Sequence, residues 1–344
     1  MTRVAIIGAN GQVGAEVCLR LREAEGIEVV PVARNLSGSA FLRLNGMSCR
    51  HGRIADPADA RRLIGDCDVV VSFALSTTAI PRFDREVNRK IVRGIVAGAK
   101  AGAPIVFAST IMVYAPAMKL RIPDSYGLEK LIVEKMLGRA CRASHHPLFV
   151  LRLGHVLGEL QNISRKICGE IGDAKVALPR QGRVASNTVF AVTIAEAIVQ
   201  VAHENAKPGT YGLITFPQWT WFDVYNYYAS QLGLPLQLAP AKQGSDYGFR
   251  GLGGLMRHFL RYLASHHALT ERLTFLMAFL PRSVNQRMYL RYLQTRALAE
   301  IDALRQSEKV EFCVEDGREL RVGSFGQMAD PATLMARYPL RLRP

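Results

Sequence analysis

The chain lacks the features that mark several other classes of protein. None of its apolar runs approaches the ~20 residues that a membrane-spanning helix needs, and it has no low-complexity tract and no repeat at solenoid spacing. The N-terminal residues enter a strand-like run at once, which is not the pattern of a signal peptide. The six cysteines include no C-x-x-C pair, so neither a zinc site nor a disulfide framework is expected. These absences predict a soluble, cytoplasmic protein that holds no metal.

Acidic residues are also scarce. The 344 residues include 29 Asp and Glu against 44 Lys and Arg, which gives a net charge of +15. An excess of this size predicts a polyanionic partner: phosphate-bearing ligands, an anionic membrane surface or nucleic acid. Nucleic acid is the least expected of the three, because no recognised nucleic-acid-binding module accompanies the charge.

The first half of the chain alternates strand-like and helix-like segments. Continuous apolar runs, typical of strands covered on both faces, predict strands at 4–8, 27–33, 68–74, 104–110 and 147–153. Helical patterns lie between them, at 12–24, 57–65, 80–101 and 126–142. This alternation predicts an α/β fold with a doubly wound parallel Rossmann sheet.

The second half of the chain is predicted to bind the substrate. We expect a dinucleotide-binding domain at 1–154 and a smaller, mostly helical substrate-binding part at 155–344, interleaved with late Rossmann elements at about 185–215. Within it, 209–214 reads as a strand and 221–233 as a helix.

The segment 250–305 is basic and helical in pattern, and its arginines are interleaved with large apolar residues over 250–296. A helical substrate lid is the favoured interpretation, because amphipathic helices more often pack on a core. Peripheral contact with the inner face of a membrane is the alternative.

A glycine-rich turn follows the first predicted strand and opens a helix, which is the context that a dinucleotide-binding motif requires. Glycines let the backbone approach a pyrophosphate, and the helix N-terminus offers free N–H groups. A tight turn without a ligand is the alternative. The residues predicted to bind the cofactor here are Gly8, Asn10, Gly11, Gln12, Val13 and Gly14.

The second predicted strand ends in Arg34, where an NAD-binding chain would carry an acid for the ribose 2′-hydroxyl. A guanidinium suits a 2′-phosphate, so NADP(H) is favoured over NAD(H) as the cofactor. A solvated loop charge is the alternative for Arg34. Arg53 is expected to contact the same phosphate or to lie along the adenine, and Ile54 to touch the adenine.

Tyr126 and Lys130 form a Y-x-x-x-K pair downstream of a strand that ends in Ser109 and Thr110. Residues four apart share one face of a helix. A free tyrosine has a pKa of about 10, and a neighbouring ammonium favours the phenolate and lowers that value. The pair therefore predicts a proton donor and acceptor, although a chance pair on a helix surface has the same spacing.

Four motifs carry a resemblance to a known family: GANGQVG (8–14), FASTIMVYA (107–115), YGLEKLIVE (126–134) and LRLGHVLG (151–158). In order and spacing, over about residues 1–235, the chain resembles the extended short-chain dehydrogenases/reductases, which include UDP-galactose 4-epimerase and many sugar-nucleotide enzymes.

The resemblance implies that Thr110 orients the substrate oxygen, that Tyr126 is the general acid or base, and that Lys130 also binds the nicotinamide ribose. It further implies cofactor contacts at the end of the strand predicted at 68–74 and in the nicotinamide pocket, and a substrate contact after 151–153. The residues concerned are Ser72, Phe73, Ala74, Ser109 and His155. A structural role is the alternative for His155.

Departures from the family pattern bear on the reaction. Thr110 is followed by Ile-Met, not by the Asp-Glu pair that 4,6-dehydratases use, which argues against loss of water. Ser186 replaces the arginine that binds a pyrophosphate in epimerases, so a nucleotide-sugar substrate is in doubt unless Arg180 or Arg183 substitutes.

The expected activity is hydride transfer to or from a sugar-like or alicyclic carbonyl or alcohol, by an NADP(H)-dependent oxidoreductase or epimerase. Reduction is slightly favoured, because NADP(H) exchanges with a reducing pool. A membrane-surface enzyme acting on a lipid-linked substrate and a non-catalytic NADP(H)-sensing regulator are the alternatives. By analogy with the family, the protein is expected to be a homodimer.

Overall fold

The computed structural model describes residues 1–76, 81–113, 125–174, 176–215, 219–239 and 330–342. The basic segment at 250–305 lies outside the described residues, so the structure bears on neither interpretation of it. Among the residues that are described, no helix is long and apolar enough to cross a membrane.

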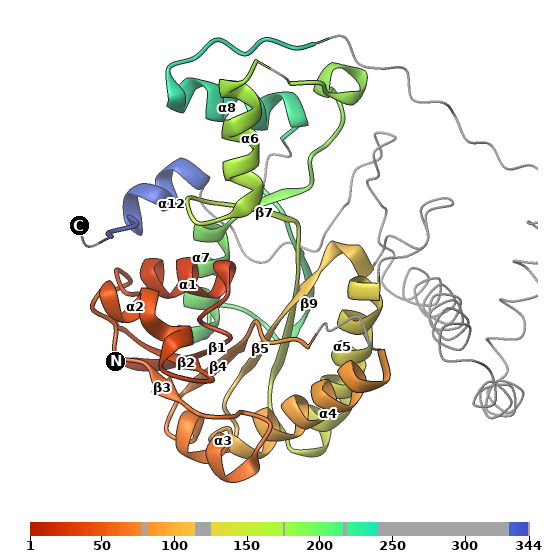
Figure 1. Cartoon of the computed structure of the whole chain (residues 1–344). Helices are drawn as coiled ribbons and strands as arrows, with labels where there is room; N and C mark the ends of the chain where they lie inside the picture. The colour runs from red at the N-terminus through yellow and green to blue at the C-terminus, as the bar shows by residue number, and fades with distance from the viewer. Residues whose placement is uncertain (77–80, 114–124, 175, 216–218, 240–329, 343–344) are drawn as a thin grey trace, which may run out of the picture.

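A single parallel sheet forms the centre of the molecule, with strand order β3-β2-β1-β4-β5-β6-β9 (Figure 1). Every neighbouring pair is parallel, as predicted. The strands are β1 (Thr2–Ile7), β2 (Ile27–Ala33), β3 (Arg50–His51), β4 (Val69–Ser72), β5 (Ile105–Thr110), β6 (Leu148–Leu153) and β9 (Gly209–Leu213). The doubly wound Rossmann architecture expected from the sequence is confirmed.

Helices cover both faces of this sheet (Figure 1). Successive residues of β1 alternate between two cores: Val4 and Ile6 pack with α1 and α7, whereas Ala5 and Ile7 pack with α3, α4 and α5. A strand buried on both sides must be apolar throughout, which is why its sequence shows no alternation. The helices concerned are α1 (Gln12–Leu21), α3 (Pro57–Ile64), α4 (Pro81–Gly98), α5 (Ser125–Ala143) and α7 (Ala191–Ala202).

The remaining elements extend beyond the carboxyl ends of the strands or lie at the sheet edge. A second, two-stranded parallel sheet pairs β7 with β8, and neither strand was predicted. Strand β9 and helix α8 agree with the predicted strand at 209–214 and helix at 221–233. The elements are β7 (His155–Leu157), β8 (Thr188–Phe190), α2 (Ala40–Leu44), α6 (Asn162–Gly172), α8 (Trp221–Leu232) and α12 (Pro331–Arg337).

A buried ion pair ties α1 to the later part of the chain. Glu16 is fully buried, and its carboxylate accepts hydrogen bonds from the backbone N–H groups of Glu159 (3.2 Å) and Leu160 (3.0 Å). Arg20, one turn further along α1, contacts the same carboxylate and donates to the Tyr338 carbonyl at 2.7 Å, next to α12. Charges on the first helix therefore hold both the turn before α6 and the C-terminal stretch.

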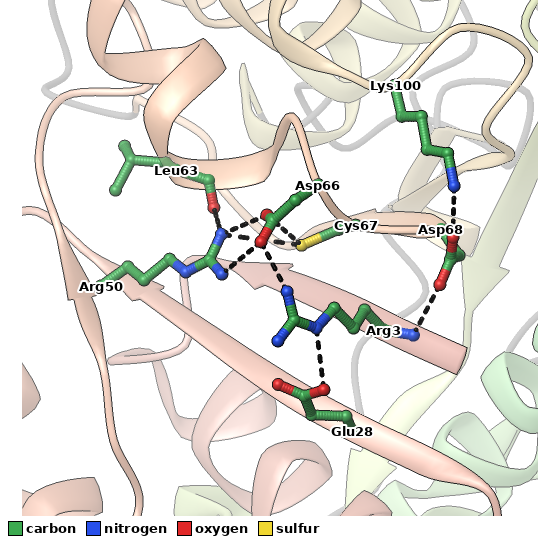
Figure 2. Close-up of polar contacts among 8 residues, drawn as sticks. All are labelled: Arg3, Glu28, Arg50, Leu63, Asp66, Cys67, Asp68 and Lys100. Carbon is green, nitrogen blue, oxygen red and sulfur yellow. Dashed lines mark hydrogen bonds and ion pairs between the residues drawn. The ribbon is translucent and has the colours of Figure 1, made fainter. Parts of the chain in front are cut away.

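A second charge cluster lies at the start of the strands, away from their carboxyl ends (Figure 2). Asp66, which precedes β4, accepts hydrogen bonds from Arg50 (2.5 and 2.8 Å) and from Arg3 (2.7 Å). Arg3 also pairs with Glu28 of β2 at 2.8 Å. The hydrogen bonds from Arg50 lower the pKa of the Asp66 carboxyl well below its usual value.

Replacing Asp66 with Asn is expected to lower the free energy of unfolding at pH 7 by about 1 kcal/mol, a modest figure because the carboxylate is half-exposed. A lowered folded-state pKa gives stability that is fully present above the unfolded value of about 3.9 and is lost as pH falls below it. The difference in unfolding free energy between the variant and the wild type should therefore become smaller when urea unfolding is measured below pH 3. Glu25→Gln, at an exposed carboxylate, is the control; a difference that grows on acidification would contradict this account.

Candidate active site

The glycine-rich turn between β1 and α1 is closed tightly on itself. Gly8 has a φ of +82°, and the Gly11 N–H donates to the Gly8 carbonyl at 3.0 Å. A Cβ on Gly14 would lie 2.4 Å from that carbonyl oxygen, and one on Gly8 would lie 3.0 Å from Ala74 N. Gly8 and Gly14 can therefore be only glycine, whereas the exposed Asn10, Gly11 and Gln12 form the accessible side of the turn.

The end of β4 lies directly against this turn. Phe73 donates its N–H to the Ile7 carbonyl at 2.9 Å, and Ala74 contacts Gly8. Ser72 is fully buried, and its hydroxyl is one of the few buried side-chain groups in the described residues without a hydrogen-bond partner. The structure thus brings the predicted cofactor residues of β1 and β4 together at the carboxyl edge of the sheet, where ligands bind in folds of this type.

The loop after β2 contributes a cation beside the glycine turn. Arg34 is exposed and is the only charged residue in 34–39. Asn35 closes the loop by accepting hydrogen bonds from the Gly38 N–H (2.8 Å) and the Ser37 hydroxyl (3.1 Å). A Cβ on Gly38 would lie 3.5 Å from the Asn10 side chain, so the two loops are side by side.

Arg53 and Ile54 follow β3, the strand next to β2. Arg53 is exposed, and its backbone N–H donates to Asp59 at 2.9 Å. Ile54 is buried, and α4 packs against it so closely that a Cβ on Gly94 would overlap the Ile54 carbonyl. Both residues lie at the same sheet edge as Arg34, and their adenine and phosphate contacts stay predictions.

The predicted catalytic residues meet where β5 ends and α5 begins. Thr110 is the last residue of β5, and its hydroxyl accepts a hydrogen bond from the Met112 N–H at 3.2 Å. The first turn of α5 rests on the same segment, because a Cβ on Gly127 would lie 2.4 Å from the Met112 carbonyl oxygen. Glycine after Tyr126 therefore lets the tyrosine's helix come close to Thr110.

Lys130 is buried, with 3% of its surface exposed, and its ammonium donates to the Ala108 carbonyl at 2.5 Å. The nitrogen lies 4.7 Å from the centre of the Phe107 ring and 5.7 Å from that of Tyr126. Burial lowers the pKa of Lys130 to about 8, and the charge of Glu134 acts in the opposite direction. Tyr126 is 38% exposed, so its side chain is accessible to solvent, whereas the neighbouring Lys130 is shielded from solvent.

Ser109 points its hydroxyl into a buried polar cluster. The hydroxyl donates to the carboxylate of Glu134 on α5, which also pairs with Arg152 of β6 at 2.8 Å. The proposed contact of Ser109 with the nicotinamide stays a prediction. Sequence reasoning assigned no role to Glu134 or Arg152, although the spacing 126, 130, 134 places Glu134 on the same helix face as the tyrosine and lysine.

The predicted substrate residues lie near the start of α8. His155, exposed in β7, has its ring 5.6 Å from that of Trp221. Arg183 is exposed next to Val184, whose carbonyl accepts a hydrogen bond from the Trp221 N–H at 3.0 Å. Ser186 is buried and hydrogen-bonds to the Trp219 carbonyl at 2.8 Å, so it does not replace the missing arginine as an exposed anion contact.

A cavity of about 410 Å³ lies between α6, α8 and α12. None of the predicted site residues lines this cavity. Among the described residues, no group of three or more His, Cys, Asp or Glu side chains could hold a metal ion.

A family model described as the NAD dependent epimerase/dehydratase family matches residues 4–213, well over half of the chain. The chain belongs to this family. Membership confirms the predicted extended short-chain dehydrogenase/reductase type, and the protein is a dinucleotide-dependent enzyme of the epimerase and oxidoreductase kind. A search of curated proteins found no match.

Solved structures of this family's enzymes share the fold. UDP-N-acetylglucosamine 4-epimerase from Bacillus cereus matches with a TM-score of 0.51 at 17% identity, covering 72% of this chain and 91% of its own. UDP-glucuronic acid 4-epimerase from Bacillus cereus, in complex with NAD, matches with a TM-score of 0.54 at 17% identity, covering 70% of this chain and 88% of its own. The enzyme WbmH from Bordetella bronchiseptica, in complex with NAD+, matches with a TM-score of 0.53 at 21% identity, covering 71% of this chain and 87% of its own. At these identities the likeness concerns the fold.

Proposed function

We propose that this family member is an NADP(H)-dependent oxidoreductase or epimerase, acting on a sugar-like or alicyclic carbonyl or alcohol, with reduction the favoured direction. The observation that carries the proposal is the buried Lys130 ammonium, held between the end of β5 and the ring of an accessible Tyr126. When bound, the nicotinamide supplies or accepts the hydride. The glycine turn, whose tightness leaves no room for a Cβ, supports binding of the diphosphate.

Three side chains take part in the proton transfer. The phenol of Tyr126 donates a proton to the substrate oxygen in reduction and takes one from the alcohol in oxidation. Lys130 lies beside it and, as an ammonium, favours the phenolate, which brings the tyrosine into range for exchange near neutral pH. Thr110, at the end of the adjacent strand, holds the substrate oxygen by its hydroxyl.

Arg34 supports the preference for NADP(H). It is the only charge of a loop that touches the glycine turn, and it is exposed and cationic where an NAD-binding chain would carry a carboxylate. A guanidinium there can bind a 2′-phosphate with charge-assisted hydrogen bonds, and it gains much less from a neutral 2′-hydroxyl.

Replacing Arg34 with Ala is expected to weaken NADPH binding roughly 10- to 100-fold, the range of one lost charge-assisted hydrogen bond, and to leave NADH binding nearly unchanged. Fluorescence titration of each reduced cofactor measures both dissociation constants. Arg61→Ala, at an exposed arginine on α3, is the matched control. Equal losses for the two cofactors, or a wild type that prefers NADH, would refute the assignment to a 2′-phosphate.

His155 and Arg183 are proposed as substrate contacts, because both are exposed beside the start of α8. Similar solved structures include complexes with UDP-sugars, among them a UDP-glucose 4-epimerase from Thermotoga maritima with UDP-glucose. The buried Ser186 speaks against this substrate class here, unless Arg183 takes the diphosphate.

The reaction type can be tested with the purified protein, NADPH and a panel of carbonyl compounds. Loss of the near-ultraviolet nicotinamide absorbance indicates reduction. Interconversion of two sugar epimers without net loss of that absorbance indicates epimerisation. Tight NADPH binding with neither change across sugar and alicyclic substrates would favour a non-catalytic sensor and count against the enzyme proposal.

We also propose a cofactor domain at 1–154 and a substrate part at 155–344. The return of the chain to the central sheet as β9, and of α7 to pack on α1, supports the expected interleaving at 185–215. A homodimer formed through α4 and α5 is proposed by analogy with the family. Cytoplasmic location, and a peripheral membrane contact through 250–296, stay predictions.

A further inference from the structure

A polar cluster lies beneath the proposed catalytic residues, between the sheet and α5. Glu134 accepts a hydrogen bond from Ser109 of β5 and two from Arg152 of β6, at 3.2 Å from Nε and 2.8 Å from Nη2. Ser109 and Arg152 are partners in the register of the two strands. All three side chains are buried, and Arg152 is only 1% exposed.

Lys130 lies close to this cluster. It precedes Glu134 by one helical turn, on the same face of α5, and its ammonium donates to the carbonyl of Ala108, the residue before Ser109. In a low-dielectric interior a nearby carboxylate favours the charged form of a buried ammonium. Ser109 and Arg152 therefore hold the Glu134 carboxylate within one helical turn of Lys130.

We propose that Glu134, held in place by Ser109 and Arg152, is a positioning residue for the reaction: its carboxylate lets Lys130 remain an ammonium in its buried site beside Tyr126. The inference rests on the proposed function only in the use that the reaction makes of this ammonium. The placement of the charges stands on the contacts alone.

The charged groups around Lys130 support this role for Glu134. From α5, Glu134 raises the pKa of Lys130, while burial lowers it to about 8. Arg152 of β6 pairs with Glu134, and the Ala108 carbonyl and the Phe107 ring of β5 lie against the ammonium. The charged side chains of α4, Arg85 and Asp84, act on Glu129, whose own pKa is raised mainly by burial.

The sign of the expected change follows. A pKa of about 8 leaves most of Lys130 protonated at pH 7. In Glu134→Gln the carboxylate's favourable charge is lost, and burial acts against the ammonium without compensation. The lysine should then titrate about one pH unit or more lower. Arg152→Gln keeps the carboxylate and its hydrogen bond from Ser109, so the lysine should titrate closer to its wild-type midpoint than in Glu134→Gln.

The test is an NMR titration of protein labelled with ¹³C at lysine Cε, with the Lys130 signal assigned by its loss in Lys130→Arg. We expect a lower Lys130 midpoint in Glu134→Gln, and a midpoint nearer the wild type in Arg152→Gln and in Glu134→Asp, which both keep the carboxylate. A cluster that merely holds the structure together would change the unfolding temperature of these variants and leave the midpoint where it was. An unchanged midpoint in folded Glu134→Gln overturns the proposal.

The pH profile of kcat/KM in the same variants then links the cluster to the reaction. Its alkaline limb should move with the Lys130 midpoint, to lower pH in Glu134→Gln and little in Glu134→Asp, with kcat affected more than KM. If the NMR midpoints move and the profile does not, the counter-ion role stands and the proposed use of Lys130 in the reaction fails. If the midpoints do not move, the inference fails, whatever the profile shows.

Discussion

Replacing Tyr126 with Phe is expected to abolish turnover while leaving cofactor binding intact. General acid–base groups contribute roughly 10²–10⁴-fold in rate, and the phenol oxygen is the only atom removed. Because Tyr126 is partly exposed at the first turn of α5, losing its hydroxyl should cost little stability. Steady-state kinetics, NADPH titration and thermal unfolding separate these three effects.

Tyr211→Phe is the matched control for this prediction. Its hydroxyl donates to the Lys207 carbonyl at 2.6 Å, on β9 and away from the glycine turn and α5, so the variant should turn over like the wild type. Turnover by Tyr126→Phe within about tenfold of the wild type would remove the tyrosine from the proton-transfer role. Loss of NADPH binding in that variant would instead assign the residue to the cofactor.

Replacing Glu16 with Gln is expected to cost about 3–5 kcal/mol of unfolding free energy, the range for breaking a buried ion pair by removing one partner. Glu16 is fully buried and Arg20 is 1% exposed, so the guanidinium would keep only its ion pair with the exposed carboxylate of Glu159, at 3.1 Å. The amide would also serve the N–H groups of Glu159 and Leu160 less well than the carboxylate does. Urea unfolding measures the loss.

The double variant Glu16→Leu with Arg20→Met is the informative control for the ion pair. Removing both charges from a buried site is often far less costly than removing one, so it should recover much of the stability lost in Glu16→Gln. A loss below about 1 kcal/mol in Glu16→Gln would show that the pair is not the anchor of α1 to the turn before α6.

Much of the fold could be predicted from the sequence, because most strands of the central sheet are continuous apolar runs between helices of clear period. The prediction missed β3, β7 and β8, which are two or three residues long and carry no periodicity of their own. It also missed α6, whose buried apolar side chains form a narrow stripe at Ile167 and Ile171 within an otherwise polar segment. Such elements are held by neighbours distant in the sequence.

The candidate site, too, could be predicted only in part from the sequence. Tyr126 and Lys130 could be predicted to share a helix face, because a four-residue spacing sets this locally. Ser109, at the end of a strand, was assigned to the nicotinamide pocket by the family resemblance, yet its hydroxyl hydrogen goes to Glu134. No spacing indicates that partner, since the pair forms only when α5 packs on β5.

By itself the sequence determined the strand–helix alternation, the glycine turn and the tyrosine–lysine spacing, because these depend on residues within a few positions of one another. The tertiary structure alone decided which charges lose contact with water. Glu16, Arg20, Glu134 and Arg152 would each be solvated on an isolated helix or strand, and they become buried ion pairs only because distant segments cover them. Desolvation is a property of the packed chain, and so are the proton affinities that it sets.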